Sequence, residues 1–293
     1  MARQSLTIIT GPTGVGKSAY AVALATTCQG EILNADSQQV YRGCDIGTGK
    51  LPLRERRGVV HHLLDAFAPD QQCNAAQFVA RADAVCVDIH RRGHRAIVVG
   101  GTGLYLRSLM FGLCDAPPSD PACRQALQQR YAAEGGAALR AELARSDPDL
   151  AGRIHPHHAT RLIRALEVRQ LTGESIRVWQ QRHTPSPRYE AQWIGLAMPR
   201  GQLHERIADR IRQQLAAGWL TEVERLSRDY GPDIAILQAI GYRELLAYLH
   251  KERSWDDTVS RIMAATRQYA KRQMTYLRRL PMIEWITCGK TIA

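Results

Sequence analysis

A glycine-rich segment near the start of the chain carries the residue types that bind phosphate. Residues 11–18 read GPTGVGKS and match the pattern G-x-x-x-x-G-K-[ST]. A β-branched run from Leu6 to Thr10 precedes them, and an alanine-rich, helix-prone segment from Ala19 to Cys28 follows. This order of strand, glycine loop and helix predicts an anion-binding loop, in contrast to an accidental glycine-rich turn. The expected phosphate-binding residues are Gly11, Pro12, Thr13, Gly14, Val15, Gly16, Lys17 and Ser18. Lys17 would neutralise the phosphate, and the Ser18 hydroxyl suits Mg²⁺.

Asp36 is the acidic residue best placed to act beside this loop. A nucleotide-hydrolysing motor needs an acid at the end of a second apolar strand, yet the apolar run from Ala96 to Val99 continues into Gly100-Gly101-Thr102. Asp36 follows another short apolar segment, residues 31–35. At the carboxyl end of a parallel strand it would face the ligand crevice. The alternative for Asp36 is an N-cap of the next segment.

Four short apolar segments place these residues in an α/β fold. They are residues 6–10, 31–35, 96–99 and 193–198, and helical patterns separate them. Fully apolar short strands predict a parallel sheet with helices on both faces. Residues 121–185 carry only helical patterns, such as Arg124–Ala144 and Arg161–Leu171, and predict a helical insertion domain. The core domain would then comprise residues 1–120 and 186–293, with helices at 202–228, 240–249 and 254–280.

Positive charge is concentrated outside the first 120 residues. The 293 residues carry a net charge of +11, and 34 of the 39 cations are arginine. Cations and acids number 12 and 10 in residues 1–120, 10 and 6 in residues 121–185, and 17 and 12 in residues 186–293. From Thr258 to Ile283 there are six cations and no acid, interleaved with Tyr269 and Tyr276. This pattern suits a nucleic-acid backbone with stacked bases, or a solvated helix face.

Composition narrows the class of protein further. The chain is 45% hydrophobic and 23% charged, as in ordinary globular proteins. Its seven cysteines are scattered and form no C-x-x-C motif, which indicates a reducing compartment and no structural metal. A signal peptide and a membrane span are not evident, so we expect a cytoplasmic protein without a membrane partner.

Six ordered blocks resemble one known family. Besides GPTGVGKS they are DSQQVYRGCDIGTGK (36–50), GGTGLYL (100–106), RLIRALEVRQLTG (161–173), QAIGYRE (238–244) and TRQYAKRQMTYLR (266–278). Together they resemble the tRNA dimethylallyltransferases, also called tRNA isopentenyltransferases. Departures are small, with Cys44 for the usual methionine, Gly49 for alanine and Tyr276 for tryptophan. The chain ends without the zinc-finger extension of eukaryotic members, so the resemblance is to the bacterial type.

The resemblance implies transfer of a dimethylallyl group from dimethylallyl diphosphate to N6 of the adenosine directly 3′ of the anticodon. The product would be N6-dimethylallyladenosine, with diphosphate released, Mg²⁺ as cofactor and no ATP consumed. Asp36 would be the general base, Thr102 would hydrogen-bond the bridging oxygen, and Lys17 would stabilise the leaving group. Arg210 is a further candidate for diphosphate, with a surface arginine as its alternative. The adenine would leave its stack to reach the crevice, with the insertion clamping the anticodon stem-loop and the chain acting as a monomer.

The resemblance also implies a set of tRNA contacts. They are Asp36, Ser37, Gln38, Gln39, Thr102, Arg124, Thr160, Arg161, Leu162, Ile163, Arg164, Gln238, Ala239, Ile240, Gly241, Tyr242, Arg243, Lys271, Arg272, Gln273, Met274, Thr275, Tyr276, Leu277 and Arg278. Either Gln38 or Gln39 could read the adenine edge. Leu162, Leu166 and Val168 also have the spacing of a core face, and the two tyrosines could be packed as well as stacked.

Two other functions share some of these features. A phosphate-loop kinase for a nucleoside or small molecule would keep the glycine loop and a helical lid but would require ATP. A non-enzymatic RNA-binding module would use the loop only as an anion site. The GGTGLY and DSQQ blocks argue against both, because neither role needs them.

Overall fold

A parallel sheet forms the centre of the computed structural model, which describes residues 4–288. Four of its strands match the apolar segments: β1 (Ser5–Thr10), β2 (Gly30–Asn34), β4 (Arg95–Val99) and β5 (Glu190–Ala197). Within the described residues the sheet has six parallel strands in the order β3-β2-β4-β1-β5-β6. Ile8 pairs with Val98 on one side and with Trp193 on the other. The prediction of an α/β fold with a parallel sheet is confirmed.

The two edge strands, β3 (His61–His62) and β6 (Ile283–Thr287), were not predicted. β3 has only two residues, and β6 reads IEWIT with four of its five residues exposed. Neither strand therefore has the apolar run that marks a buried strand.

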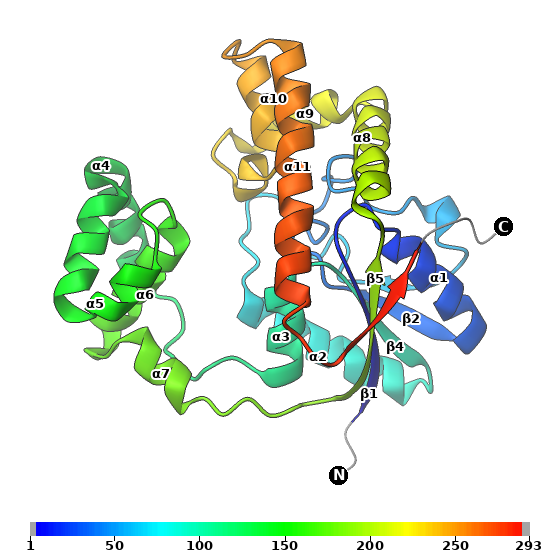
Figure 1. Ribbon diagram of the computed structural model, residues 1–293, viewed down its shortest axis with the longest axis horizontal. Helices are drawn as coiled ribbons and strands as arrows, with labels where there is room; N and C mark the ends of the chain where they lie inside the picture. The colour runs from blue at the N-terminus through cyan, green and yellow to red at the C-terminus, as the bar shows by residue number, and fades with distance from the viewer. Residues whose placement is uncertain (1–3, 289–293) are drawn as a thin grey trace. The chain divides into compact units, whose positions relative to one another are not determined.

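Helices cover both faces of the sheet, because both sets of alternating strand side chains are apolar. Leu6 and Ile8 pack with α2 (Ala75–Arg91) and α3 (Gly103–Phe111). Ile9 faces the other way and packs with α1 (Lys17–Cys28) and α8 (Arg200–Ala216). The carboxyl ends of β1, β2 and β4 lead directly into the loops that carry the candidate site (Figure 1).

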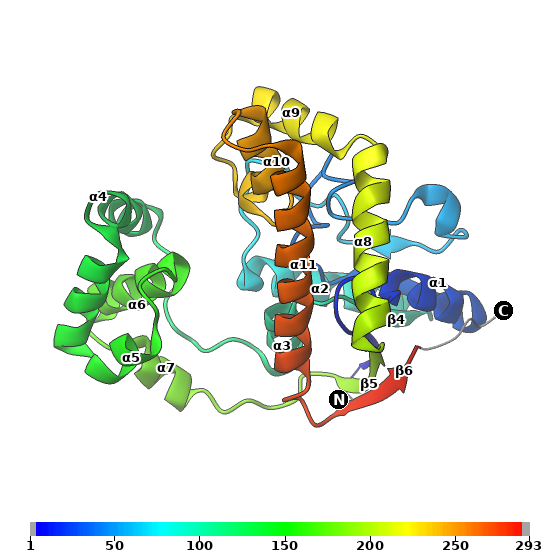
Figure 2. The same cartoon turned by 45° about the horizontal axis from the view of Figure 1, so that its top comes forward.

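The C-terminal part contributes a group of helices beside the sheet: α9 (Trp219–Tyr230), η2 (Ala235–Gln238), α10 (Tyr242–Leu249) and α11 (Trp255–Leu277), while η1 (Leu53–Glu55) lies earlier in the chain. The prediction of one helix over 202–228 was wrong. Gly218, with φ of 96°, adopts a left-handed conformation that separates α8 from α9. Helices α8 and α11 run side by side in both views (Figures 1 and 2). None of the helices in residues 4–288 has the length and apolar character to cross a membrane.

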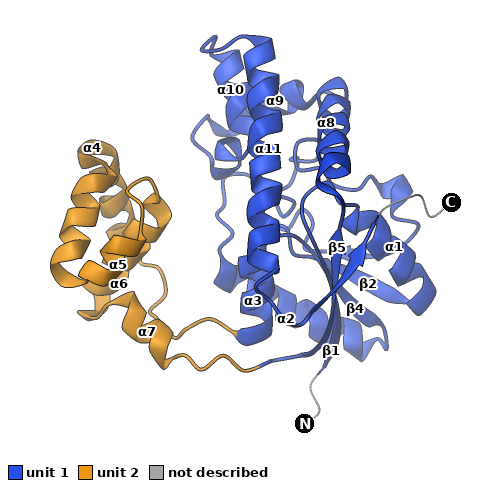
Figure 3. Cartoon of the chain, in the orientation of Figure 1, with its two compact units in different colours: residues 1–111, 187–293 blue, residues 112–186 orange. Residues whose placement is uncertain are grey.

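The chain divides into two compact units, drawn in Figure 3. Unit 1 comprises residues 1–111 and 187–293, and unit 2 comprises residues 112–186. Unit 2 thus begins at Gly112, earlier than the expected residue 121. It contains α4 (Pro121–Ser146), α5 (Pro148–Arg153), α6 (Ala159–Thr172) and α7 (Ile176–Arg182) around its own core, which includes Leu127, Leu139, Leu143, Leu162 and Leu166. The expected continuous helix 124–144 is interrupted at Gly135, where φ is 79° and ψ is 164°.

Candidate active site

The glycine loop between β1 and α1 encloses the N-terminus of α1. Gly16 has φ of 103° and immediately precedes Lys17, the first residue of the helix. A Cβ atom on Gly11 would lie 2.4 Å from the Leu196 carbonyl oxygen, so only glycine lets β5 approach this closely. The loop therefore turns tightly and leaves the positive end of the α1 dipole at its centre.

Lys17 lies inside this loop. Its Nζ donates hydrogen bonds to the carbonyl oxygens of Gly11 at 3.0 Å and Pro12 at 2.8 Å. Burial lowers the pKa of the Lys17 ammonium to about 8, while the Asp36 charge raises this pKa and the Arg210 charge lowers it further. Among the described residues the hydrogen-bond partners of Nζ are these two carbonyl oxygens, so the partly buried ammonium is well suited to an arriving anion.

Asp36 follows β2 and forms a tight side-chain turn. Its Oδ1 accepts the Gln38 N–H at 2.9 Å, and its own N–H donates to Asn34 Oδ1 at 3.2 Å. One carboxylate oxygen is thus used in a turn, although no helix begins at this residue. No partner of Oδ2 is present within residues 4–288. Asp36 can thus hold its loop with one oxygen and act on a ligand with the other.

Thr102 connects the turn after β4 to the Asp36 segment. Its Oγ1 accepts the Ser37 N–H at 3.1 Å and lies 3.4 Å from the Ser37 hydroxyl. Thr102 is only partly buried, and Gly100 on the same turn lines the cavity at the phosphate loop. The two predicted segments, DSQQ and GGT, therefore meet at Ser37.

Two arginines of α8 lie at the phosphate loop. Arg210 donates from Nη2 to the Thr13 hydroxyl at 2.9 Å, and burial lowers its pKa from the ordinary value despite the opposing charge of Asp36. In the described part of the chain its buried Nε has no hydrogen-bond partner. Arg206 lies one turn earlier on α8, and a Cβ on Gly16 would lie 3.5 Å from its Nη2. Sequence reasoning missed Arg206, although its i, i+4 spacing from Arg210 on a helix was a usable signal.

Two cavities meet at these residues. The first, of about 200 Å³, is lined by the loop residues Lys17 and Ser18 and by Arg206. The second, of about 360 Å³, is lined by Gln38, Gln238, Tyr269 and Arg272 among others. Four residues line both cavities: Thr13, Asp36, Thr48 and Arg210. A ligand in the phosphate-loop cavity and a second ligand in the neighbouring cavity would therefore meet beside Asp36.

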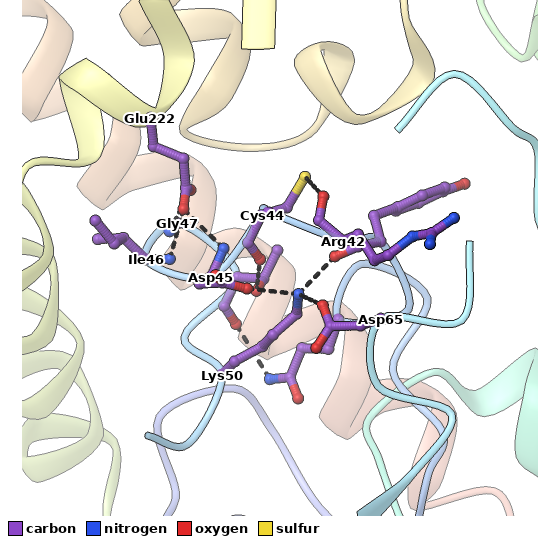
Figure 4. Close-up of polar contacts among 12 residues, drawn as sticks. Arg42, Cys44, Asp45, Ile46, Gly47, Lys50, Asp65 and Glu222 are labelled. Carbon is purple, nitrogen blue, oxygen red and sulfur yellow. Dashed lines mark hydrogen bonds and ion pairs between the residues drawn. The ribbon is translucent and has the colours of Figure 1, made fainter. Parts of the chain in front are cut away.

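The loop of residues 45–50 lines both cavities through Gly47, Thr48 and Gly49. Figure 4 shows the polar contacts that hold this loop. The buried Glu222 carboxylate accepts the N–H groups of Asp45 at 2.7 Å, Ile46 at 2.8 Å and Gly47 at 3.0 Å. The buried Lys50 ammonium donates to Asp45 and Asp65 on the other side of the loop. Sequence reasoning did not single out Glu222 or Lys50, because a carboxylate that binds backbone amides has no sequence signature.

The comparisons with known proteins agree with this geometry. A family model described as IPP transferase matches residues 39–280. The chain belongs to the IPP transferase family. The match spans Asp45–Lys50, Glu222 and α11, while the phosphate loop lies just before it.

Curated relatives and solved structures of this family match nearly the whole chain. A protein named tRNA dimethylallyltransferase 1 from Trichlorobacter lovleyi is 46% identical over 95% of this chain and 92% of its own length. The crystal structure of a tRNA isopentenylpyrophosphate transferase from Bacillus halodurans is 36% identical, with a TM-score of 0.72, and covers 97% of this chain and 90% of its own. A eukaryotic dimethylallyltransferase acting on tRNA has a TM-score of 0.82 at 29% identity, covering 97% of this chain and 74% of its own.

Several residues that the family resemblance assigned to tRNA are exposed in unit 1. Gln238, Arg243, Lys271, Arg272, Thr275 and Arg278 are exposed, and Gln238, Ala239 and Ile240 line the second cavity. Ser37 and Gln38 line that cavity as well. Gln39 instead lines the first cavity and donates from Nε2 to the carbonyl oxygens of Thr48 and Gly49.

Other predicted tRNA contacts of this IPP transferase are buried. In unit 1 these are Gly241, Tyr242, Gln273 and Leu277, and in unit 2 they are Leu162 and Ile163. Leu162, Leu277 and Tyr242 expose 1% of their surface or less. Leu162, Ile163 and Leu277 pack in the hydrophobic cores, whereas Tyr242 is buried and still lines the second cavity. Tyr276 and Met274 are partly buried, and the Tyr276 hydroxyl donates to the Gly103 carbonyl at 3.3 Å.

In unit 2, Thr160 and Arg161 are exposed at the start of α6. Arg124 and Arg164 are instead engaged within the unit. Arg164 pairs with the buried Glu167 at 2.7 Å and donates to the Pro117 carbonyl, while Arg124 donates to the Ser119 hydroxyl. These contacts tie the start of unit 2 to α6, which is a structural use of both arginines.

Proposed function

We propose that this chain transfers a dimethylallyl group from dimethylallyl diphosphate to N6 of the adenosine directly 3′ of the anticodon of tRNA. The bond between the allylic carbon and the diphosphate oxygen breaks, a bond between that carbon and N6 forms, and N6 loses a proton. The observation that carries the proposal is the meeting of two cavities at Asp36, one built on a phosphate loop and the other opening toward exposed cations.

Asp36 is the proposed acceptor of the proton. An adenine amino group is a weak nucleophile, because its lone pair is delocalised into the ring, and it needs a base as the new bond forms. Oδ2, which has no partner among residues 4–288, supplies that base, while Oδ1 keeps the turn by accepting the Gln38 N–H. Since Asp36 lines both cavities, it can contact the amine and still face the donor.

The diphosphate leaving group is bound by the phosphate loop. Lys17, the loop amides and Arg210 are the groups that stabilise its charge, and Arg210 still has a buried Nε without a partner in the described residues. Arg206 joins them at the mouth of the first cavity. Thr102, two residues after Gly100 in the wall of the first cavity, is the proposed donor to the bridging oxygen, and its hydroxyl makes a long 3.4 Å contact with the Ser37 hydroxyl. Preorganised donors of this kind lower the barrier where charge develops.

Mg²⁺ is the proposed cofactor, and the residues present fit it. Residues 4–288 contain no cluster of three or more His, Cys, Asp or Glu side chains that could hold a metal ion. Mg²⁺ commonly keeps several waters and binds through one or two protein oxygens together with substrate phosphates. The Ser18 hydroxyl, which lines the first cavity, is the proposed protein ligand. When bound, the ion would neutralise part of the diphosphate charge.

Gln38 is the proposed reader of the adenine. Both Gln38 and Gln39 have the donor and acceptor needed for an adenine edge. The Gln39 side-chain amide donates to the carbonyl oxygens of loop 45–50. Gln38 lines the second cavity, and in the described part of the chain its side chain makes a single 3.4 Å contact, with the Ser37 hydroxyl. The adenine would leave its stack to enter this cavity.

The proposed RNA surface of unit 1 follows α11. Lys271, Arg272 and Thr275 are exposed along it, and together with the exposed Arg279 just beyond its end they line a shallow groove of about 450 Å³. The Arg272 guanidinium lies 5.8 Å from the centre of the Tyr269 ring. A group of exposed cations on one helix can contact a phosphate backbone. Thr160 and Arg161 are the proposed contacts of unit 2.

A labelled-donor assay tests the function. Purified protein with Mg²⁺, dimethylallyl diphosphate labelled in its allyl group and unmodified tRNA is expected to give labelled N6-dimethylallyladenosine without ATP. A strict requirement for ATP would favour a small-molecule kinase, and tRNA binding without transfer would favour an RNA-binding module. Label at any other nucleotide would contradict the proposed acceptor.

A further inference from the structure

Three residues on one face of α11 lie against the turn that follows β4. Tyr269, Gln273 and Tyr276 have the i, i+4, i+7 spacing that places side chains on one helix face. Gln273 Nε2 donates to the Gly101 carbonyl at 3.0 Å, and the Tyr276 hydroxyl donates to the Gly103 carbonyl at 3.3 Å. Tyr269, on the same face, neighbours Thr102 and Gln273. This face of α11 thus holds the turn at Gly101 and at Gly103.

Gln273 also holds the phosphate loop. Its Oε1 accepts the Thr13 N–H at 2.8 Å, so a single side-chain amide bridges the loop and the turn. Gln273 is 6% exposed, and a Cβ on Gly101 would lie 2.2 Å from its Nε2. The amide therefore fits a space that exists only because residue 101 is glycine, and both of its polar atoms are satisfied.

The connection extends to Asp36. The turn carries Thr102, whose Oγ1 accepts the Ser37 N–H next to Asp36. Three segments, the phosphate loop, the GGT turn and the DSQQ segment, are therefore joined through Gln273 and Thr102. Segments that come from different parts of the chain need such a link to keep reacting groups in register.

The solvent-exposed side of the same helix turn carries cations. Lys271 and Arg272, which precede Gln273 directly, are exposed, while Gln273 is buried. One turn of α11 thus offers positive charge to solvent and an amide to the phosphate loop. Gln273 itself exposes only 6% of its surface, and its amide is engaged by the loop and the turn.

We propose that Gln273 is a positioning residue for the diphosphate leaving group. By taking up the Thr13 N–H it fixes the shape of the loop, so that the remaining amides and Lys17 are directed to the diphosphate before it binds. By donating to the Gly101 carbonyl it also fixes the position of the neighbouring Thr102 relative to the phosphate loop. This inference rests on the proposed function and adds a residue that acts through the loop and never touches either substrate.

Gln273→Met tests the proposal, because it keeps the length of the side chain and removes both hydrogen bonds. We expect the Kd for inorganic diphosphate with Mg²⁺ to rise about 3- to 10-fold, as the loss of one or two neutral hydrogen bonds predicts. The kcat should fall at least about tenfold, because misplaced groups cost most in the transition state. The Kd for an anticodon stem-loop should stay within about twofold. Gln213→Met, the same substitution at an exposed position of α8, is the matched control.

Gly101→Ala disturbs the same contact from the side of the turn. We expect the same rise in the Kd for diphosphate and the same fall in kcat, with little change in the Kd for the stem-loop. The proposal would be overturned if Gln273→Met and Gln213→Met had the same affinity for diphosphate or the same turnover. Equal losses in stem-loop affinity and turnover would also overturn it and make Gln273 an RNA contact. Transfer by the unaltered chain tests the proposed function separately, and diphosphate binding by calorimetry needs no transfer at all.

Discussion

At the scale of single residues, the two carboxylate oxygens of Asp36 have different tasks. Asp36→Asn separates them, because an asparagine Oδ1 still accepts the Gln38 N–H while the base is lost. We expect kcat to fall by about 10²- to 10⁴-fold, the usual contribution of a general base. Stem-loop affinity should change less than about threefold, as measured by anisotropy beside single-turnover kinetics. Binding that falls as steeply as turnover would show that Asp36 recognises RNA instead.

Because the pKa of Lys17 is lowered, we expect donor binding to depend on pH. Burial lowers its pKa to about 8, below the ordinary value of 10.5, so the ammonium is present below pH 8 and lost as pH rises through that value. We expect the affinity for inorganic diphosphate to be highest below about pH 8 and to decline above it. Calorimetry between about pH 6.5 and 9.5 measures this, with Lys17→Met as the reference. A decline of the same size in Lys17→Met would assign the pH dependence to another group.

At the scale of elements, the sequence pattern predicts those features that a short segment determines by itself. The strands β1, β2, β4 and β5 and the phosphate loop have strong local signals, an apolar run or a glycine motif, and were predicted. The break at Gly218 and the interruption at Gly135 were missed, because a single glycine within a helical pattern does not reveal its φ angle. The burial of Gln273 was missed for another reason, since only the packing of α11 on the turn 101–103 decides which face of that helix is inside.

The contacts of Glu222 with loop 45–50 belong to this scale as well. Gly47 lies so close to α9 and α10 that a Cβ would be 2.0 Å from Trp219 Nε1 and 2.5 Å from Tyr242 Cζ. Backbone N–H groups of this loop donate to the Glu222 carboxylate. Glu222→Gln would therefore turn an amide N–H₂, itself a donor, toward these N–H donors. We expect the free energy of unfolding to fall by about 2 kcal/mol, as for hydrogen bonds to a charged group.

The same substitution should raise the KM for the donor, because Thr48 and Gly49 line the first cavity. Glu224→Gln, at an exposed position of the same helix, is the control for both measurements. Denaturant unfolding and steady-state kinetics provide them. An unchanged KM together with a lower stability would limit Glu222 to a role in folding.

At the scale of the whole molecule, the charge distribution separates chemistry from RNA attraction. Residues 1–120 carry 12 cations and 10 acids, whereas the excess of arginine lies in unit 2 and the C-terminal helices. Non-specific attraction to a nucleic acid depends on the number of phosphates neutralised and falls with salt. The RNA affinity of this protein should therefore depend strongly on salt, while its chemistry depends on a few placed groups.

Arg272→Ala tests this division. We expect weaker tRNA binding and a slope of log K against log salt that is smaller by about 0.7 to 0.9, as for one lost phosphate contact. Arg228→Ala is the control, since Arg228 is exposed on α9 and already paired with Asp229. Gel shifts at several salt concentrations measure both slopes. Equal slopes for the two variants would return Arg272 to the role of a solvated surface cation.

The sheet order also has a consequence for how the chain folds during synthesis. β1 lies at the centre of the sheet between β4 and β5, yet its register pairs Ser5 with Glu190. Until β5 leaves the ribosome, one side of β1 is an unpaired edge with free N–H and C=O groups, which is a site for wrong pairing. Unit 2 is a contiguous segment with its own core and can fold within that interval. Its folding shortens the loop of flexible chain that must close before β5 docks, and so reduces the entropy cost of completing the sheet.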